Sequence, residues 1–178
     1  MTGEFIAYLK IFVSIPTAYY LLAASVAAAV MATVSGGFRK RQKDITIYRI
    51  AAYGILSGWL FLTLAETVLC RESGTSRSMQ LRLFWSYRSQ SREYLVLDLF
   101  NILLLLPAGF LLPLCGVKRF RRVLIVGFLW SLMLETLQFI TRRGLFEADD
   151  LFHNTLGACL GYLIFRLAVR IRKRRRIR

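Results

Sequence analysis

The sequence predicts an all-α, polytopic membrane protein with about five transmembrane helices, its N-terminus outside the cell and its C-terminus in the cytoplasm. Two observations predict this class. In composition, 56% of the 178 residues are hydrophobic, yet the formal net charge is +15. In distribution, the apolar residues form long runs and the basic residues cluster between them. So large a charge would destabilise one small soluble core, and a disordered chain lacks such apolar content.

Five apolar runs are long enough to cross a bilayer as helices, for which about 20 residues suffice. They span residues 11–34, 50–70, 99–117, 123–140 and 151–169. Together they leave too little chain for a separate soluble domain. We therefore divide the sequence into an N-terminal helix with a basic loop (1–49), a four-helix membrane domain (50–169) and a basic tail (170–178).

A cleaved signal peptide is the alternative interpretation of the first run, and it would leave four helices. Signal peptides begin with a positive segment followed by a shorter apolar stretch. Here the chain begins MTGEF, which carries Glu4, and the basic cluster comes after the apolar run. The pattern therefore favours a helix that stays in the membrane.

Lysine and arginine residues between the runs predict the orientation, because they stay preferentially on the cytoplasmic side. The loop 35–44, the turn 118–122 and the tail from Arg170 together hold 15 basic residues against one acid, Asp44. The segments on the opposite side hold 7 basic residues against 6 acids. The basic clusters also predict attraction to anionic lipid head groups at the cytoplasmic face.

Nucleic-acid binding is the alternative explanation of the basic charge. It requires a basic face with stacking or groove-reading elements. The tail, RLAVRIRKRRRIR, has no aromatic residue among its basic ones and directly follows an apolar run. We therefore expect the lipid bilayer as a partner and no nucleic acid.

The longest segment outside the runs is external in this orientation. Residues 79–88 largely alternate between apolar and polar side chains, a period that predicts an extended segment. Trp85 and Tyr87 favour the level of the lipid head groups. We expect this segment to lie on the outer surface of the membrane.

Polar side chains interrupt the last three runs at helical spacing. Asp98 and Asn101 are three residues apart, Glu135 and Gln138 are three apart, and Asp150 and Asn154 are four apart. Each set therefore forms a stripe along one helix. In the predicted orientation every one of these groups lies in the outer half of the membrane, which predicts a polar pocket that opens outward. The ligand-binding candidates are Asp98, Asn101, Glu135, Gln138, Arg143, Asp149, Asp150 and Asn154.

These residues also have structural interpretations. Small residues four apart let helices approach closely, and asparagine and glutamine form hydrogen bonds between helices. Acids such as Asp149 and Asp150 are common at the start of a helix, and Arg142 and Arg143 could pair with them. His153 lacks the second ligand of an HExxH-type site, so we expect no metal and no cofactor. The residues expected to serve helix packing are Pro107, Gly109, Gly157 and Gly161.

At these positions the sequence resembles the VanZ-like family. The resemblance runs through NILLLLPAGF (101–110), ETLQ (135–138) and RGLFEADDLFHNTLGACLG (143–161), and it covers about residues 50–169. The segment LFWSY (83–87) is similar to an external family motif, although Leu83 replaces its proline. Glu147 stands where an aspartate is usual. The resemblance implies a bacterial protein of the cytoplasmic membrane, and the founding member lowers susceptibility to teicoplanin-type glycopeptide antibiotics.

Three functions follow as hypotheses. The first is a binding or accessory protein whose pocket holds a cell-wall precursor, a glycopeptide or another envelope component. The second is an enzyme that acts on an extracytoplasmic lipid or envelope precursor, with Glu135 and Asp150 as its catalytic acid and base. The third is a small transporter that relays protons or cations, although the sequence has no internal repeat of the kind such transporters use. We rank them in this order.

Overall fold

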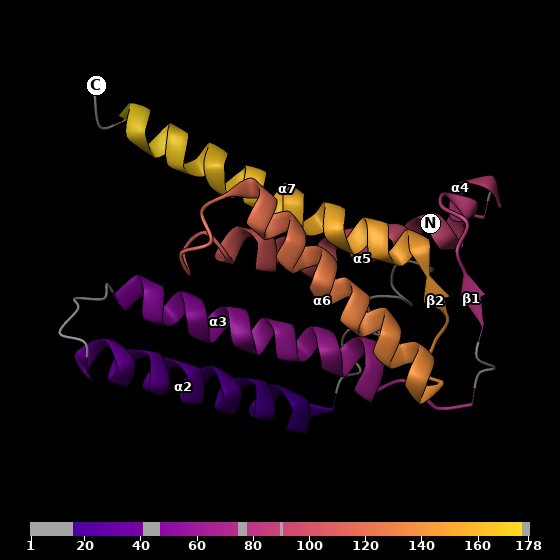
Figure 1. Cartoon of the computed structure of the whole chain (residues 1–178), viewed down its shortest axis with the longest axis horizontal. Coiled ribbons are helices and arrows are strands. Elements are labelled where there is room, and N and C mark those ends of the chain that lie inside the picture. The colour runs from indigo at the N-terminus through magenta and orange to yellow at the C-terminus, as the bar shows by residue number, and fades with distance from the viewer. Residues whose placement is uncertain (1–15, 41–46, 75–77, 90, 176–178) are drawn as a thin grey trace.

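Long helices dominate the computed structural model, which describes residues 16–40, 47–74, 78–89 and 91–175 (Figure 1). Within these ranges, five helices are long and apolar enough to cross a membrane, and the predicted all-α fold with five such helices is confirmed. The long helices are α2 (Thr17–Lys40), α3 (Ile47–Leu64), α5 (Arg92–Leu111), α6 (Phe120–Thr141) and α7 (Ala148–Arg175). The shorter elements are a π-helix, η1 (Ala65–Leu69), a single helical turn, α4 (Trp85–Arg88), and two short strands, β1 (Met79–Gln80) and β2 (Phe146–Glu147).

The helices extend beyond several of the apolar runs. The helix α5 begins at Arg92 and ends at Leu111, so Asp98 lies within the helix and not before it. The helix α7 continues past residue 169 to Arg175. Apolar runs end where charged residues begin, whereas backbone hydrogen bonding continues wherever the charged side chains can reach water. The start predicted for the first helix, at residues 11–15, lies outside the described residues.

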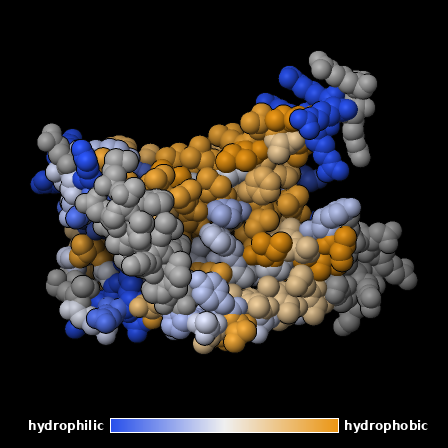
Figure 2. Space-filling view, turned by 180° about the vertical axis from the view of Figure 1, so that it is seen from behind, coloured by the Kyte–Doolittle hydropathy of each residue, from blue (hydrophilic) through white to orange (hydrophobic). Residues whose placement is uncertain are grey.

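The bundle has two chemically distinct ends. We call the end that carries η1, β1, α4, β2 and the starts of α5 and α7 the polar end. We call the opposite end the basic end; it carries the turn 112–119 and the last turns of α7, with Arg172, Lys173, Arg174 and Arg175. In Figure 2, apolar residues cover the middle of the bundle, and hydrophilic residues gather toward its ends. Outward leucines such as Leu21 and Leu167 are 71% and 58% exposed, which suits a surface in contact with lipid.

The segment 79–88 is not extended throughout, so that prediction is wrong in part. Met79 and Gln80 form β1, which pairs in parallel with β2, but residues 85–88 form the turn α4. Phe84 precedes this turn with left-handed backbone (φ 61°). The backbone N–H groups of Phe84 and Ser86 both donate to Asp149 in α7. These hydrogen bonds to Asp149, which is distant in the sequence, therefore favour a helical turn over the extended strand that the alternation predicts.

Helices α5 and α7 approach until their backbones touch. A Cβ atom at Gly157 would overlap the carbonyl oxygen of Ile102, and one at Gly161 would overlap that of Leu106. From the other side, a Cβ atom at Gly109 would overlap the carbonyl oxygen of Ala158. Glycine is therefore required at these three crossings, the arrangement that close packing of membrane helices favours.

Around this contact lies a continuous apolar core. Leu105 and Ala158 are each 1% exposed, and Val123 at the start of α6 is fully buried. Pro107 lies inside α5, where it removes one backbone donor. The indole of Trp59 in α3 donates to the carbonyl of Leu104 at 2.8 Å, which ties α3 to the same part of α5.

We expect Gly157→Leu to prevent stable assembly of the bundle. Overpacking a core typically costs about 1–3 kcal/mol, and here the new side chain meets backbone that can yield only if α5 moves. The measurement is the amount of protein in the membrane and its thermal unfolding in detergent. The control is Ala168→Leu, an exposed position on the same helix, which should leave both unchanged. Equal stability of the two variants would contradict this account of the α5–α7 contact.

Candidate functional site

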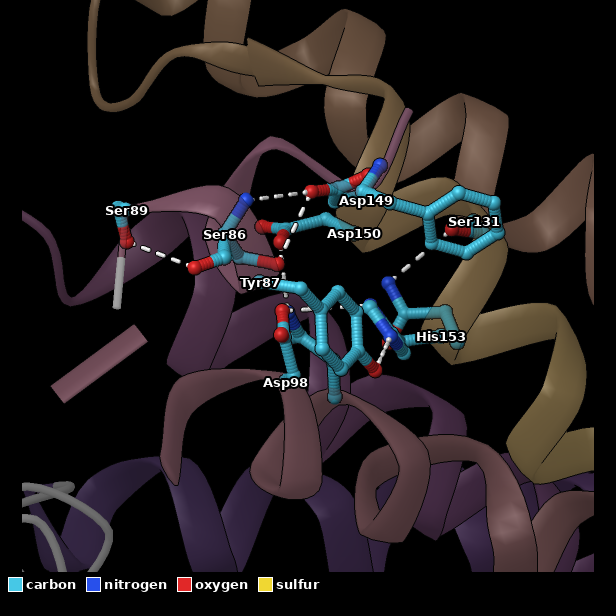
Figure 3. Close-up of polar contacts among 11 residues, drawn as sticks. Ser86, Tyr87, Ser89, Asp98, Ser131, Asp149, Asp150 and His153 are labelled. Carbon is cyan, nitrogen blue, oxygen red and sulfur yellow. Dashed lines mark hydrogen bonds and ion pairs between the residues drawn. The ribbon is translucent and has the colours of Figure 1, made fainter. Parts of the chain in front are cut away.

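A cluster of polar side chains lies buried between the helices at the polar end (Figure 3). Its members come from α5, α6 and α7, and α4 covers them from outside. Six of them are at most 5% exposed: Asp98, Glu135, Gln138, Asp149, His153 and Asn154. Burial of so many polar groups is costly unless each finds a partner, so their contacts define what the site can do.

Asp149 holds the segment 78–89 against the bundle. Its carboxylate accepts the N–H of Phe84 at 2.5 Å, the N–H of Ser86 at 3.2 Å and the hydroxyl of Ser86 at 3.1 Å. Asp149 and Asp150 also occupy the first turn of α7, where the helix dipole favours negative charge. Asp149 is therefore occupied by backbone and hydroxyl donors, and its role in the structure is to hold α4 in place.

His153 connects a buried carboxylate with an exposed hydroxyl. Its Nδ1 lies 3.3 Å from Oδ1 of Asp98, and its Nε2 is hydrogen-bonded to the hydroxyl of Tyr87 at 2.8 Å. The donor in the bond between His153 and Tyr87 depends on the imidazole tautomer, and the buried Nδ1 makes no hydrogen bond with the described residues. His153 is fully buried, whereas Tyr87 is 49% exposed. Burial, together with the nearby Asp98 and Asp149 carboxylates, raises the pKa of Tyr87.

The two carboxylates predicted as an acid–base pair belong to the same cluster, where Glu135 is buried and Asp150 is half-buried. The backbone N–H of Glu147 donates to Glu135 at 3.0 Å, and the amide of Asn101 donates to Asp150 at 2.7 Å. Glu135 and Asp150 are close enough to interact electrostatically. The structure thus brings together, from three different helices, the residues that the sequence placed at one depth.

The positive charge of Arg71 lies near the carboxylates of this cluster, and the sequence pattern did not identify this residue. The Arg71 guanidinium interacts electrostatically with Glu135, Glu147 and Asp150. It lies against Gly144, where a Cβ atom would be 3.1 Å from Nη1 of Arg71. Burial raises the pKa of Glu147, as does the neighbouring Asp149 carboxylate, while Arg71 opposes the shift.

Gln138 and Arg143 brace the π-helix at the edge of the cluster. The amide of Gln138 donates to the carbonyl of Thr67 at 2.9 Å, and Arg143 donates to those of Val68 and Leu69 at 3.0 and 2.8 Å. A π-helix shifts the usual pattern of backbone bonds, and these side chains supply donors to its carbonyls. Arg143 therefore engages backbone oxygens here, in place of the acids at 147–150 with which the sequence suggested a pairing.

The side chain of Asn154 makes fewer hydrogen bonds than it can, because its carbonyl oxygen accepts none from the described residues. Its amide donates to the hydroxyl of Ser131 at 3.0 Å. Its carbonyl oxygen Oδ1 is buried and has no hydrogen-bond partner among the described residues, and the indole N–H of Trp85 in α4 is likewise without one. An unused acceptor at 2% exposure marks a position where a ligand donor would be stabilised.

Besides Arg71, the structure adds two residues that sequence reasoning did not select as ligand-binding candidates. These are His153 and Tyr87. His153 is the only histidine of the sequence and lies next to Asn154, which was a usable signal. Tyr87 is separated from it by 66 positions, and nothing local predicts their contact. Within the described ranges, no three His, Cys, Asp or Glu side chains are arranged to hold a metal ion.

We expect Asp149→Ala to release the segment 78–89 from the bundle. Hydrogen bonds to a charged group contribute about 1.5–3 kcal/mol, so backbone hydrogen exchange at Phe84 and Ser86 should accelerate about tenfold or more. The measurement is hydrogen–deuterium exchange of this segment in detergent-solubilised protein. Glu93→Ala, an exposed acid in the first turn of α5, is the control and should leave exchange unchanged. Unaltered exchange in Asp149→Ala would contradict the role assigned to this carboxylate.

Comparison with known proteins gives one match that covers most of the bundle. No curated protein and no solved structure matches the chain. A family model described as VanZ/LLP1 matches residues 47–169, which include helices α3, α5 and α6, most of α7 and every residue of the buried polar cluster. The match covers well over half of the chain, and it contains the stretches on which the resemblance was based. The protein therefore belongs to the VanZ/LLP1 family.

Proposed function

We propose that this protein of the bacterial cytoplasmic membrane binds a cell-envelope component at its polar end and thereby lowers susceptibility to teicoplanin-type glycopeptides. The observation that carries the proposal is the unsatisfied Oδ1 of buried Asn154, set among the carboxylates Glu135 and Asp150. Membership in the VanZ/LLP1 family supports the antibiotic connection.

The distribution of charge supports an outward-facing polar end. The basic turn 118–122 and the last turns of α7 to Arg175 belong to the opposite end, and lysine and arginine stay preferentially in the cytoplasm. The described acids all belong to the polar end, in residues 66–98 and 135–150. The cluster then faces the side of the membrane on which cell-wall precursors and glycopeptides are found.

The chemistry of the cluster suits ligands rich in hydrogen-bond donors. Carboxylate and amide oxygens accept from hydroxyl and amide N–H groups, which sugars and peptides carry in abundance. Beside them lies an exposed aromatic surface: Phe84 and Phe152 pack edge to face at 5.2 Å, and Tyr87 adjoins Phe84 at 6.0 Å. A cell-wall precursor or a glycopeptide combines both kinds of surface.

The test is glycopeptide susceptibility in cells that express the wild-type protein, Glu135→Gln or Asp150→Asn at matched abundance in the membrane. We expect the wild-type protein to raise the inhibitory concentration of teicoplanin. Because each substitution replaces one acceptor oxygen with an amide donor, each variant should retain only part of the effect. The control is Glu72→Gln, an exposed acid outside the cluster, which should behave as wild type. No difference between wild type and empty vector would refute the antibiotic function.

Catalysis is the second candidate, and the Asp98–His153–Tyr87 connection favours it. A histidine oriented by a carboxylate and joined to a hydroxyl is an arrangement suited to general acid–base catalysis. In this alternative His153 moves protons between Tyr87 and the buried acids, beside a lipid or envelope precursor held by Asn101 and Asn154.

The two candidates differ in how substitutions act. An enzyme predicts that His153→Gln abolishes the effect on susceptibility although the protein still inserts and folds, because a proton-transfer group is lost. A binding protein predicts graded losses across Asp98, Asn101, Gln138 and Asn154, with His153→Gln comparable to the others. The measurement is the same susceptibility assay, with protein abundance and thermal unfolding recorded for every variant.

A further inference from the structure

A cavity of about 400 Å³ opens at the basic end, far along α7 from the polar cluster. Three of its lining residues are cations: Lys118 in the turn before α6, and Arg166 and Arg170 in α7. Its apolar surface comes from Tyr162, Phe165, Val169 and Pro113. Neither the predicted site nor the proposed function uses any of these residues.

Helical spacing and one hydrogen bond hold the cavity in shape. Tyr162, Arg166 and Arg170 are four residues apart and so share one face of α7. The hydroxyl of Tyr162 donates to the carbonyl of Lys118 at 3.0 Å, which fastens the turn against the helix. The Arg166 guanidinium lies 6.0 Å from the centre of the Tyr162 ring, a cation–π contact that orients it over the buried tyrosine.

Among the described residues, those that line the cavity carry three positive charges and no negative one. No acid lines it, and the described acids lie at the polar end. Three cations around one cavity favour a ligand with a phosphate group, since guanidinium and ammonium groups bind phosphate oxygens through charge-assisted hydrogen bonds. The apolar side of the cavity is open to what would be lipid, since Val169, which lines it, is 50% exposed.

We propose that this cavity binds an anionic phospholipid of the membrane. The phosphate group lies among Lys118, Arg166 and Arg170, and the acyl chains run along Phe165 and the exposed side of Val169. This site is specific in shape, unlike the general attraction of the exposed basic tail to anionic lipid. In the orientation that the sequence predicts, it takes its lipid from the cytoplasmic leaflet.

The test compares two double variants that lose the same charge. Arg166→Gln/Arg170→Gln removes two cations of the cavity, and Lys173→Gln/Arg174→Gln removes two cations that do not line it. Binding of dioctanoyl phosphatidylglycerol to full-length protein in detergent is measured by native mass spectrometry, with thermal unfolding as the check on folding. The cavity variant should bind about tenfold or more weakly, and the tail variant should change by less than about twofold.

Three further probes separate the sources of the phosphate. Dioctanoyl phosphatidylcholine has the same chains and phosphate without net negative charge, and it should bind much more weakly. Inorganic phosphate and glycerol phosphate lack acyl chains and should not compete at the concentrations at which the lipid binds. Equal losses in the two double variants would overturn the proposal, because they would show general electrostatic attraction. Competition by inorganic phosphate at lipid-like affinity would overturn it as well, in favour of a soluble phosphate.

Discussion

The backbone contact between α5 and α7 is the constraint on which the buried cluster depends. Three glycines let the two helices meet without side chains between them. Both helices begin at the polar end, so the contact sets their first turns side by side. The pairs Asp98–His153 and Asn101–Asp150 each join one helix to the other across this contact. A larger separation would break both of these pairs in an apolar surrounding.

Inside a membrane, the kind of donor that each buried carboxylate accepts from matters for its stability. Asp98 lies 3.3 Å from the His153 ring, whereas Glu135, Asp149 and Asp150 accept hydrogen bonds from uncharged donors. Glu135 and Asp149 accept backbone N–H groups, and Asp150 accepts an amide. Neutral donors stabilise a carboxylate without requiring a second buried charge, whose desolvation would be costly.

Much of the fold follows from the pattern of apolar residues. The five runs predicted five helices because burial in lipid demands continuous apolar length, and the stripes predicted which depth the polar groups share. The ends of the helices were less predictable. The apolar run begins at residue 99, after Asp98, whereas α5 begins at Arg92 and includes Asp98.

The partners within the site could not be derived from the sequence for a physical reason. Spacing along one helix shows which side chains share a face, but it says nothing about the rotation of that face toward a particular neighbour. The bond between Asp149 and Ser86 spans 63 positions, and that between Gln138 and Thr67 spans 71. The π-helix that Gln138 and Arg143 support is only five residues long, so no sequence period predicts it. Such contacts depend on how whole helices pack.

The length of α7 has a consequence for the position of the whole molecule. Its 28 residues rise about 42 Å, whereas the hydrocarbon core of a bilayer is about 30 Å thick. The arginine-rich last turns must therefore stand in the head-group layer on one side, and their preferred depth there determines how far α7 is drawn through the bilayer. Since the first turn of the same rigid helix carries Asp149 and Asp150, the height of the buried cluster relative to the opposite surface is linked to the lipid composition around the basic end. One leaflet can in this way adjust how accessible the protein is from the other.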